Sequence, residues 1–277
     1  MTKQTAATAM TSATARTAWD ELPGPVRDAV RSRVGEVRHV DVINSGLNAS
    51  FTACLRTTSG RVFAKGAHSD RAAALRREAA TNPYVETVAP ALRWQVDTDG
   101  WYLLGFEYLD GHSADLTPAS ADLTRVADLL GHVAELEPPA AGCRRIADRW
   151  AEPAGQADVD PGLLAGNQLL HTDLNPHNIL ITKSGARLVD WAWPALGAAW
   201  IDTACTALWL IAEGHTPNQA EAWAATVPTW TDASDAAIDA FTAINRVLWE
   251  QIAHDEPRSW KQQLHSAANA WSLYRRA

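Results

Sequence analysis

The sequence predicts an α+β fold, with a small antiparallel β-sheet in its N-terminal part and a larger, mainly helical C-terminal part. Short β-like runs separated by turn residues fill the N-terminal third, and apolar residues at helical spacing dominate after Thr117. A chain of 277 residues is long enough to bury a core in each of two lobes. We expect a flexible tail at residues 1–18, a first lobe at 19–107 and a second lobe at 108–277.

The β-like runs of the first lobe follow one another closely. Residues 39–43, 51–56 and 61–65 are separated by short turn segments, which predicts a three-stranded antiparallel meander. Residues 70–80 then have the pattern of a helix. Residues 101–108 form one further predicted strand.

The second lobe begins with helical signals. Thr117 and Pro118 form a cap and first-turn pair, and apolar residues then recur at helical spacing until Pro138. Farther along, residues 205–212 are apolar on every side, which predicts a buried helix that ends at Gly214.

Three short strands and three more helices complete the second lobe. The predicted strands are residues 168–170, 178–182 and 187–189, of which the last two form a hairpin. Thr216 and Gln219 have the spacing of a capping box, which begins one helix. Apolar residues at helical spacing mark the other two helices, at 238–252 and 260–274.

Composition excludes several classes of protein. No run approaches the roughly 18 apolar residues that a membrane span needs. Residues 150–277 hold 14 acidic and 7 basic side chains, a net charge of −7, whereas residues 1–149 hold 18 and 17, a net charge of −1. This balance argues against a nucleic-acid partner and suits a cationic substrate, although a solvated acidic surface would look the same. The three scattered cysteines and the lack of a signal peptide favour the cytoplasm. We expect a monomer or a dimer.

The strongest chemical signal runs from His171 to Asp190. It reads H-x-D-L-x-x-x-N, then a hairpin, then D-W. A hydroxyl nucleophile needs an acceptor for its proton, and a metal-bound triphosphate needs oxygen ligands on a second, fixed element. We expect Asp173 to be the proton acceptor, and Asn178 and Asp190, brought together by the hairpin, to hold Mg²⁺.

This segment resembles the aminoglycoside phosphotransferase and choline kinase family, kinase-like enzymes for small molecules whose catalytic loop commonly reads H-G-D-L-H-P-G-N. The chain has Thr172, Asn175 and His177 at the variable positions, and Ala192 where the family often has an acid. The resemblance covers residues 40–213, approximately, with its motifs in order. It implies a protein-kinase-like bilobal fold that uses ATP or GTP as phosphate donor.

The same resemblance assigns nucleotide-binding roles to two upstream segments. Ser45, Gly46 and Asn48 resemble a shortened nucleotide-covering loop, in which small residues let backbone N–H groups approach the phosphates. An ordinary hairpin turn would look the same. Residues 106–109 resemble the family's hinge, the segment that joins the two lobes. Backbone groups of Glu107 and Leu109 would there hydrogen-bond the purine base.

Lys65 lies where a kinase-like strand offers a lysine to the α- and β-phosphates. Its alternation with Phe63 places it on an inward face, where a lysine requires an anionic partner. Glu78, on the following helix, is the expected partner. A surface salt bridge is the alternative, since Arg76 and Arg77 could also engage Glu78.

Two features of the C-terminal part remain open at this stage. Asp202 opens the apolar helix as a natural N-cap, and in the resembled family an aspartate at this point tethers the catalytic loop. Nine of the 13 tryptophans follow position 190, where they could stack on a substrate ring or pack in the core.

The sequence thus predicts transfer of a nucleotide γ-phosphate to a hydroxyl of a small molecule. The favoured acceptor is an antibiotic such as an aminoglycoside or another amino-sugar or nucleoside compound, which implies resistance or self-protection. A sugar or amino-alcohol metabolite is the alternative within the same chemistry. A nucleotide-binding pseudokinase or regulatory scaffold is the alternative of another class, and a protein kinase is disfavoured because too few residues separate Asp190 from Asp202 for an activation segment.

Overall fold

The computed structural model describes residues 16–43, 49–140 and 142–277. They form two compact units. Unit 1 runs to Pro83 and includes Pro90–Leu109, and unit 2 comprises Tyr84–Ala89 and Asp110–Ala277. Within these described ranges, no helix is both long enough and apolar enough to cross a membrane.

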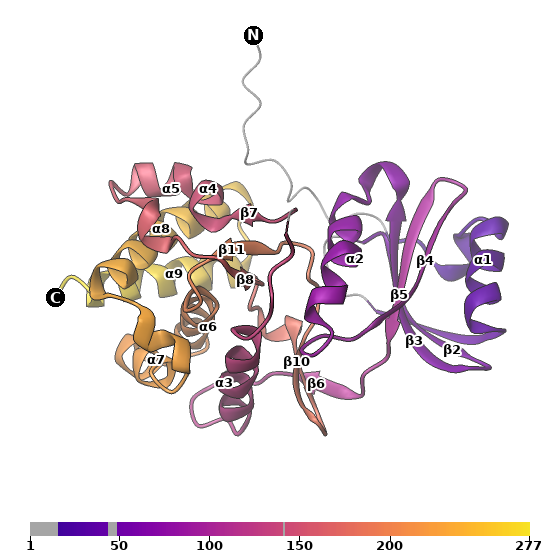
Figure 1. The fold of residues 1–277 in the computed structure, drawn as a ribbon, viewed down its shortest axis with the longest axis horizontal. Helices are drawn as coiled ribbons and strands as arrows, with labels where there is room; N and C mark the ends of the chain where they lie inside the picture. Colours follow the sequence, from indigo (N-terminus) through magenta and orange to yellow (C-terminus); the bar gives the residue numbers. More distant parts are fainter. Residues whose placement is uncertain (1–15, 44–48, 141) are drawn as a thin grey trace, which may run out of the picture. The chain divides into compact units, whose positions relative to one another are not determined.

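A five-stranded antiparallel sheet forms the centre of unit 1 (Figure 1). Its strand order is β1-β2-β3-β5-β4. The strands are β1 (Val37–Val42), β2 (Phe51–Thr57), β3 (Gly60–His68), β4 (Leu92–Thr98) and β5 (Trp101–Glu107). The predicted meander and the later strand are confirmed, whereas β4 was not predicted.

Two helices cover opposite faces of this sheet (Figure 1). Helix α1 (Gly24–Val34), which was not predicted, packs through Val26 and Val30 on the face that carries Leu103. Helix α2 (Ala73–Val85) packs through Leu75 on the face that carries Leu104. Short 3-10 turns, η1 (Trp19–Glu21) and η2 (Ser69–Arg71), precede the two helices.

Unit 2 is mainly helical, with two small three-stranded sheets ordered β10-β9-β6 and β7-β11-β8. Its strands are β6 (Gly111–Ser113), β7 (Arg144–Arg145), β8 (Gln168–Leu170), β9 (Ile179–Thr182), β10 (Gly185–Leu188) and β11 (Ala195–Gly197). Its α-helices are α3 (Asp122–Val133), α4 (Ile146–Arg149), α5 (Ala151–Gln156), α6 (Ile201–Ala212), α7 (Pro217–Ala224), α8 (Asp235–Asp255) and α9 (Ser259–Tyr274). The 3-10 turns are η3 (Pro161–Leu164), η4 (Pro176–Asn178) and η5 (Pro228–Asp232). The predicted α+β class is confirmed.

The predicted start of α3 at Thr117 is wrong. The helix begins at Asp122, because both the N–H and the hydroxyl of Thr117 donate to the carboxylate of Asp115, at 2.9 and 2.7 Å. Ala119 also takes a left-handed conformation, with φ of 67°, which interrupts a helix. The capping box at α7 is confirmed: the Gln219 N–H donates to the Thr216 hydroxyl, and the Thr216 N–H donates to the Gln219 side chain.

The tryptophans of unit 2 contribute to its core. The ring of Phe241 lies 5.8 Å from each of the rings of Trp150, Trp200 and Trp271, all in edge-on arrangements. All three tryptophans are buried. Packing, rather than an open stacking surface, explains these side chains.

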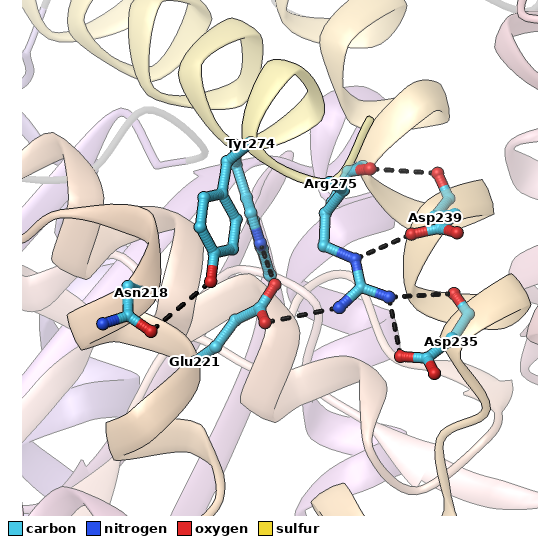
Figure 2. Close-up of polar contacts among 8 residues, drawn as sticks. Asn218, Glu221, Asp235, Asp239, Tyr274 and Arg275 are labelled. Carbon is cyan, nitrogen blue, oxygen red and sulfur yellow. Dashed lines mark hydrogen bonds and ion pairs between the residues drawn. The ribbon is translucent and has the colours of Figure 1, made fainter. Parts of the chain in front are cut away.

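Acidic side chains of the C-terminal helices form ion pairs within the unit. Figure 2 shows the Arg275 guanidinium between Glu221 of α7 and Asp235 and Asp239 of α8, at 3.3, 2.8 and 2.7 Å. Glu256 similarly pairs with the buried Lys261 at 2.6 Å. Part of the negative charge after residue 150 is therefore neutralised by neighbouring bases.

Candidate active site

Two loops of unit 2 are held side by side at both ends. Residues 171–178 connect β8 to β9, and residues 189–194 connect β10 to β11. At one end Leu170 pairs with Ala195, and at the other Ile179 pairs with Leu188. The strand pairing therefore brings the expected proton acceptor and the expected metal ligands, which come from two separate loops, into one region.

His171 joins the first loop to the second. Its Nδ1 accepts the Asp173 N–H at 3.2 Å, so the proton of the neutral ring lies on Nε2, which donates to the Val189 carbonyl at 3.0 Å. The ring is buried and lies edge-on against Trp191, with a centroid distance of 4.7 Å. These contacts fix the orientation of the backbone immediately before Asp173.

Asp202 tethers the start of the same loop. Its two carboxylate oxygens accept the N–H groups of His171 and Thr172, at 2.8 and 2.9 Å. The N-cap alternative is wrong, because α6 begins one residue earlier with Trp200 at the cap position. Burial raises the pKa of Asp202 to about 6, and its two backbone hydrogen bonds oppose that rise.

Asp173 lies at the centre of the first loop. Its carboxylate Oδ2 and its backbone carbonyl each accept a hydrogen bond from Asn178 Nδ2, at 3.0 Å. The surrounding protein, and then the negative charge of Asp190, raise the pKa of Asp173 to about 6, while the Asn178 bond opposes the rise. The residue still keeps solvent-exposed surface, so a substrate hydroxyl can approach it.

The residues expected to hold a metal offer oxygen donors. Because Asn178 Nδ2 is committed to Asp173, its Oδ1 is the side-chain atom left for a cation. Asp190 follows Val189, whose N–H donates to the Asn178 carbonyl at 2.8 Å. One amide oxygen and one carboxylate fit Mg²⁺, which binds few protein ligands and takes the rest of its shell from water and phosphates. Among the described residues, no group of three or more His, Cys, Asp or Glu side chains could hold a metal ion.

Lys65 and Glu78 meet in unit 1. Lys65 on β3 lies opposite Leu104, on the sheet face that α2 covers, and its Nζ is 2.6 Å from Glu78 Oε2. Only 9% of the lysine side chain and 5% of the glutamate side chain are exposed, so the surface-salt-bridge alternative does not hold. Arg76 engages Asp97 instead, at 2.8 Å.

Two further segments were predicted to bind the nucleotide: the hinge at residues 106–109 and the phosphate-covering loop. The structure describes only the first of them. Glu107 ends β5, and its N–H donates to the Ala91 carbonyl at 2.9 Å, so that donor is occupied within the sheet. Leu109 is the last residue of unit 1. Ser45, Gly46 and Asn48 lie outside the described residues.

Comparisons with known proteins agree with this arrangement at the level of the fold. No protein-family model and no curated protein sequence matches the chain. Among solved structures, a thermostable mutant of aminoglycoside phosphotransferase APH(4)-Ia is similar with a TM-score of 0.66 and 11% identity, over 89% of this chain and 98% of that one. The GDP complex of aminoglycoside 2'-phosphotransferase-IIIa is similar with a TM-score of 0.56 and 13% identity, over 87% of this chain and 94% of that one. A proposed fructosamine-3-kinase from Haemophilus somnus is similar with a TM-score of 0.56 and 13% identity, over 87% of this chain and 95% of that one.

The chain has the aminoglycoside phosphotransferase fold.

Within this aminoglycoside phosphotransferase fold, the structure adds Arg149, at the end of α4, which no sequence pattern indicated. Its guanidinium donates to the Thr172 hydroxyl at 2.9 Å and to the carbonyls of Trp193 and Pro194 at 3.0 and 2.8 Å. It therefore bridges the two loops. No spacing rule links it to the motif, since its partners lie 23 to 45 residues away.

The departures from the H-G-D-L-H-P-G-N pattern have local explanations. Thr172 takes a left-handed backbone, with φ of 69°, a conformation that favours glycine. His177 lies in the 3-10 turn η4, where its N–H donates to the Asn175 side chain at 2.9 Å and its ring contacts Ser113 at 3.2 Å. The turn thus accommodates a side chain at position 177.

Proposed function

We propose that this chain is a phosphotransferase that moves the γ-phosphate of ATP or GTP to a hydroxyl group of a small molecule. The observation that carries the proposal is the position of Asp173, hydrogen-bonded to Asn178 and close enough to Asp190 for that charge to raise its pKa. A scaffold protein has no need of a carboxylate poised in this way. An enzyme that removes a proton from a hydroxyl does.

In the proposed reaction, Asp173 accepts the proton of the acceptor hydroxyl as that oxygen attacks the γ-phosphorus. Asn178 and Asp190 would hold Mg²⁺, which when bound neutralises charge on the phosphates. His171 and Asp202 keep the loop in position through their hydrogen bonds. The proton moves to Asp173, and the nucleoside diphosphate leaves with the bonding electron pair.

Unit 1 supplies the proposed nucleotide contacts. Lys65, held by Glu78, would bind the α- and β-phosphates. Because the Glu107 N–H is occupied, a purine base would be read by the Glu107 carbonyl and the Leu109 N–H. The loop that contains Ser45, Gly46 and Asn48 remains the proposed phosphate cover.

We favour an amino-sugar antibiotic as acceptor, in a cytoplasmic setting. The net charge of −7 over residues 150–277 supports a cationic compound. APH(4)-Ia, one of the similar structures, has been solved with AMP-PNP and hygromycin B. The similarity to a proposed fructosamine-3-kinase supports an amino-sugar metabolite as the second candidate.

A coupled phosphotransfer assay tests the proposal. Aminoglycosides, nucleoside antibiotics, ketosamines and amino alcohols are each offered with ATP and with GTP in the presence of Mg²⁺. We expect one class to raise nucleoside diphosphate release well above the rate without acceptor, and mass spectrometry to find one added phosphate. Mg-nucleotide binding without turnover on any acceptor would instead favour the pseudokinase alternative.

A further inference from the structure

The Arg149 side chain bridges the two loops of the candidate site close to the end where Leu170 pairs with Ala195. Its Nη1 donates to the Thr172 hydroxyl at 2.9 Å, and its Nη2 donates to the carbonyls of Trp193 and Pro194 at 3.0 and 2.8 Å. The Thr172 hydroxyl in turn donates to the Trp193 carbonyl at 3.2 Å. The three groups therefore form a closed set of charge-assisted and neutral hydrogen bonds.

Each of the two loops contains one non-glycine residue with a left-handed backbone. Thr172 and Asp190 have φ of 69° and 65°, the left-handed region in which a Cβ atom approaches the following carbonyl. The penalty is larger for a β-branched residue such as Thr172, whereas glycine would take this conformation freely. The threonine side chain must therefore contribute something that glycine cannot, and its hydroxyl is the group that bonds Arg149.

Only a few backbone residues separate these hydrogen bonds from Asp173 and Asp190. Thr172 directly precedes Asp173, and Trp193 lies three residues after Asp190. Strand pairing already fixes the loop ends at Leu170 and Ala195. The guanidinium acts beside that end, on the residue directly before Asp173, and so extends the connection between the loops beyond the strand pair.

The start of α4 is itself fixed to the same sheet. Arg144 and Arg145 of β7 pair with Ala195 and Leu196 of β11, and α4 follows at once. Arg149 is thus delivered from a rigid element to the two loops, as a positioning side chain requires.

We propose that Arg149 and Thr172 form a latch that sets the position of the Asp173 carboxylate relative to Asp190. Arg149 and Thr172 are positioning residues, and neither is expected to touch the substrate. The inference rests on the proposed function, because the value of this geometry lies in phosphate transfer.

Matched substitutions at position 172 separate the hydroxyl from the strain. Thr172→Val keeps the branched shape and the backbone penalty but removes the hydroxyl, and Thr172→Ser keeps the hydroxyl. Arg149→Met removes the guanidinium, and Arg276→Met, at an exposed site, is the control for loss of one positive charge. Each purified full-length variant is assayed for Mg-ATP turnover, with the best acceptor of the panel, well below its melting temperature.

We expect Thr172→Val and Arg149→Met to lower kcat by about tenfold or more, with KM for Mg-ATP changed by less than about threefold. Thr172→Ser should restore most of kcat, and Arg276→Met should match the wild type. A purely structural role would lower the melting temperature and leave kcat unchanged. Equal kcat for Thr172→Val and Thr172→Ser would overturn the proposal.

Hydrogen–deuterium exchange on the same proteins judges the latch without any turnover. Loss of the hydroxyl should speed exchange in both segments, 171–174 and 191–194, by about fivefold or more, whereas Thr172→Ser should not. If the wild type transfers phosphate to no acceptor, the proposed function fails while this measurement still decides the latch. Unchanged exchange in Thr172→Val would show that the hydroxyl does not couple the loops.

Discussion

The side-chain amide of Asn178 donates to both the backbone carbonyl and the carboxylate of Asp173, at 3.0 Å in each case. One side chain therefore orients the candidate base, while its own Oδ1 is the atom proposed to bind Mg²⁺. The two roles are inseparable in geometry. Substitution of either residue should affect chemistry before it affects folding, because both side chains lie in a loop whose ends are fixed by strands.

The first prediction concerns Asp173. Asp173→Asn should lower kcat by about 10²–10⁴-fold, the usual range for a lost general base. The Kd for Mg-ADP, measured by calorimetry, should stay within about threefold of the wild type, since binding does not use the proton acceptor. Glu152→Gln, an exposed acid on α5, serves as control. Full turnover by Asp173→Asn would remove Asp173 from the mechanism.

The pKa of Asp173 predicts the pH dependence of transfer. The carboxylate must be ionised to accept a proton, and its pKa is raised to about 6. The value of kcat/KM should therefore fall as the pH drops through about 6 and be level above it, because kcat/KM reports the free enzyme. A flat profile between about pH 5 and 7 would contradict this role.

The charge of Asp190 should be visible in the same titration. In the metal-free protein, the Asp190→Asn substitution removes a negative charge and should lower the pKa of Asp173. Carboxyl-carbon NMR of the Asp173 side chain measures that pKa directly. A pKa that does not move would mean that the two carboxylates are not coupled.

Sequence patterns predicted the parts of the site that are encoded locally. Asp173, Asn178 and Asp190 were expected to lie together because the proposed phosphate transfer needs these residue types on a loop and a hairpin of fixed length, and the structure brings them together. Lys65 and Glu78 were found because a lysine on an inward strand face requires a nearby anion. Both sets depend on spacing within one or two consecutive elements.

The parts that sequence could not give depend on long-range packing. For Asp202, the local pattern indicated only an N-cap, and it was the family resemblance that implied the tether to backbone N–H groups 30 and 31 residues earlier. Arg149 lies in a one-turn helix with no motif around it. Helix α3 does not start at Thr117 as predicted, because the N–H and the hydroxyl of Thr117 donate to the Asp115 carboxylate instead.

The buried pair in unit 1 predicts an asymmetric response to substitution. Lys65→Met leaves the Glu78 carboxylate buried without its 2.6 Å partner and should lower the free energy of unfolding by about 3–5 kcal/mol. The double variant Lys65→Met with Glu78→Gln should recover part of that loss while nucleotide binding stays weak. Urea unfolding and Mg-ADP titration give the two readouts. If the double variant is no more stable than Lys65→Met, the unpaired Glu78 carboxylate is not the cause of the lost unfolding free energy.

Arg275 provides a test of stability without a role in chemistry. Its guanidinium, 15% exposed, joins α9 to Glu221 of α7 and to Asp235 and Asp239 of α8 (Figure 2). Arg275→Met removes all three pairs and takes the guanidinium away from the partly buried Glu221, so we expect a loss of about 1–3 kcal/mol in urea unfolding. Asp235→Asn is the matched control: that side chain is 91% exposed, so its change should stay below about 0.5 kcal/mol. Because the cluster belongs to none of the proposed catalytic contacts, kcat of both variants should match the wild type at low temperature, and a selective fall in kcat for Arg275→Met would instead tie α9 to the acceptor.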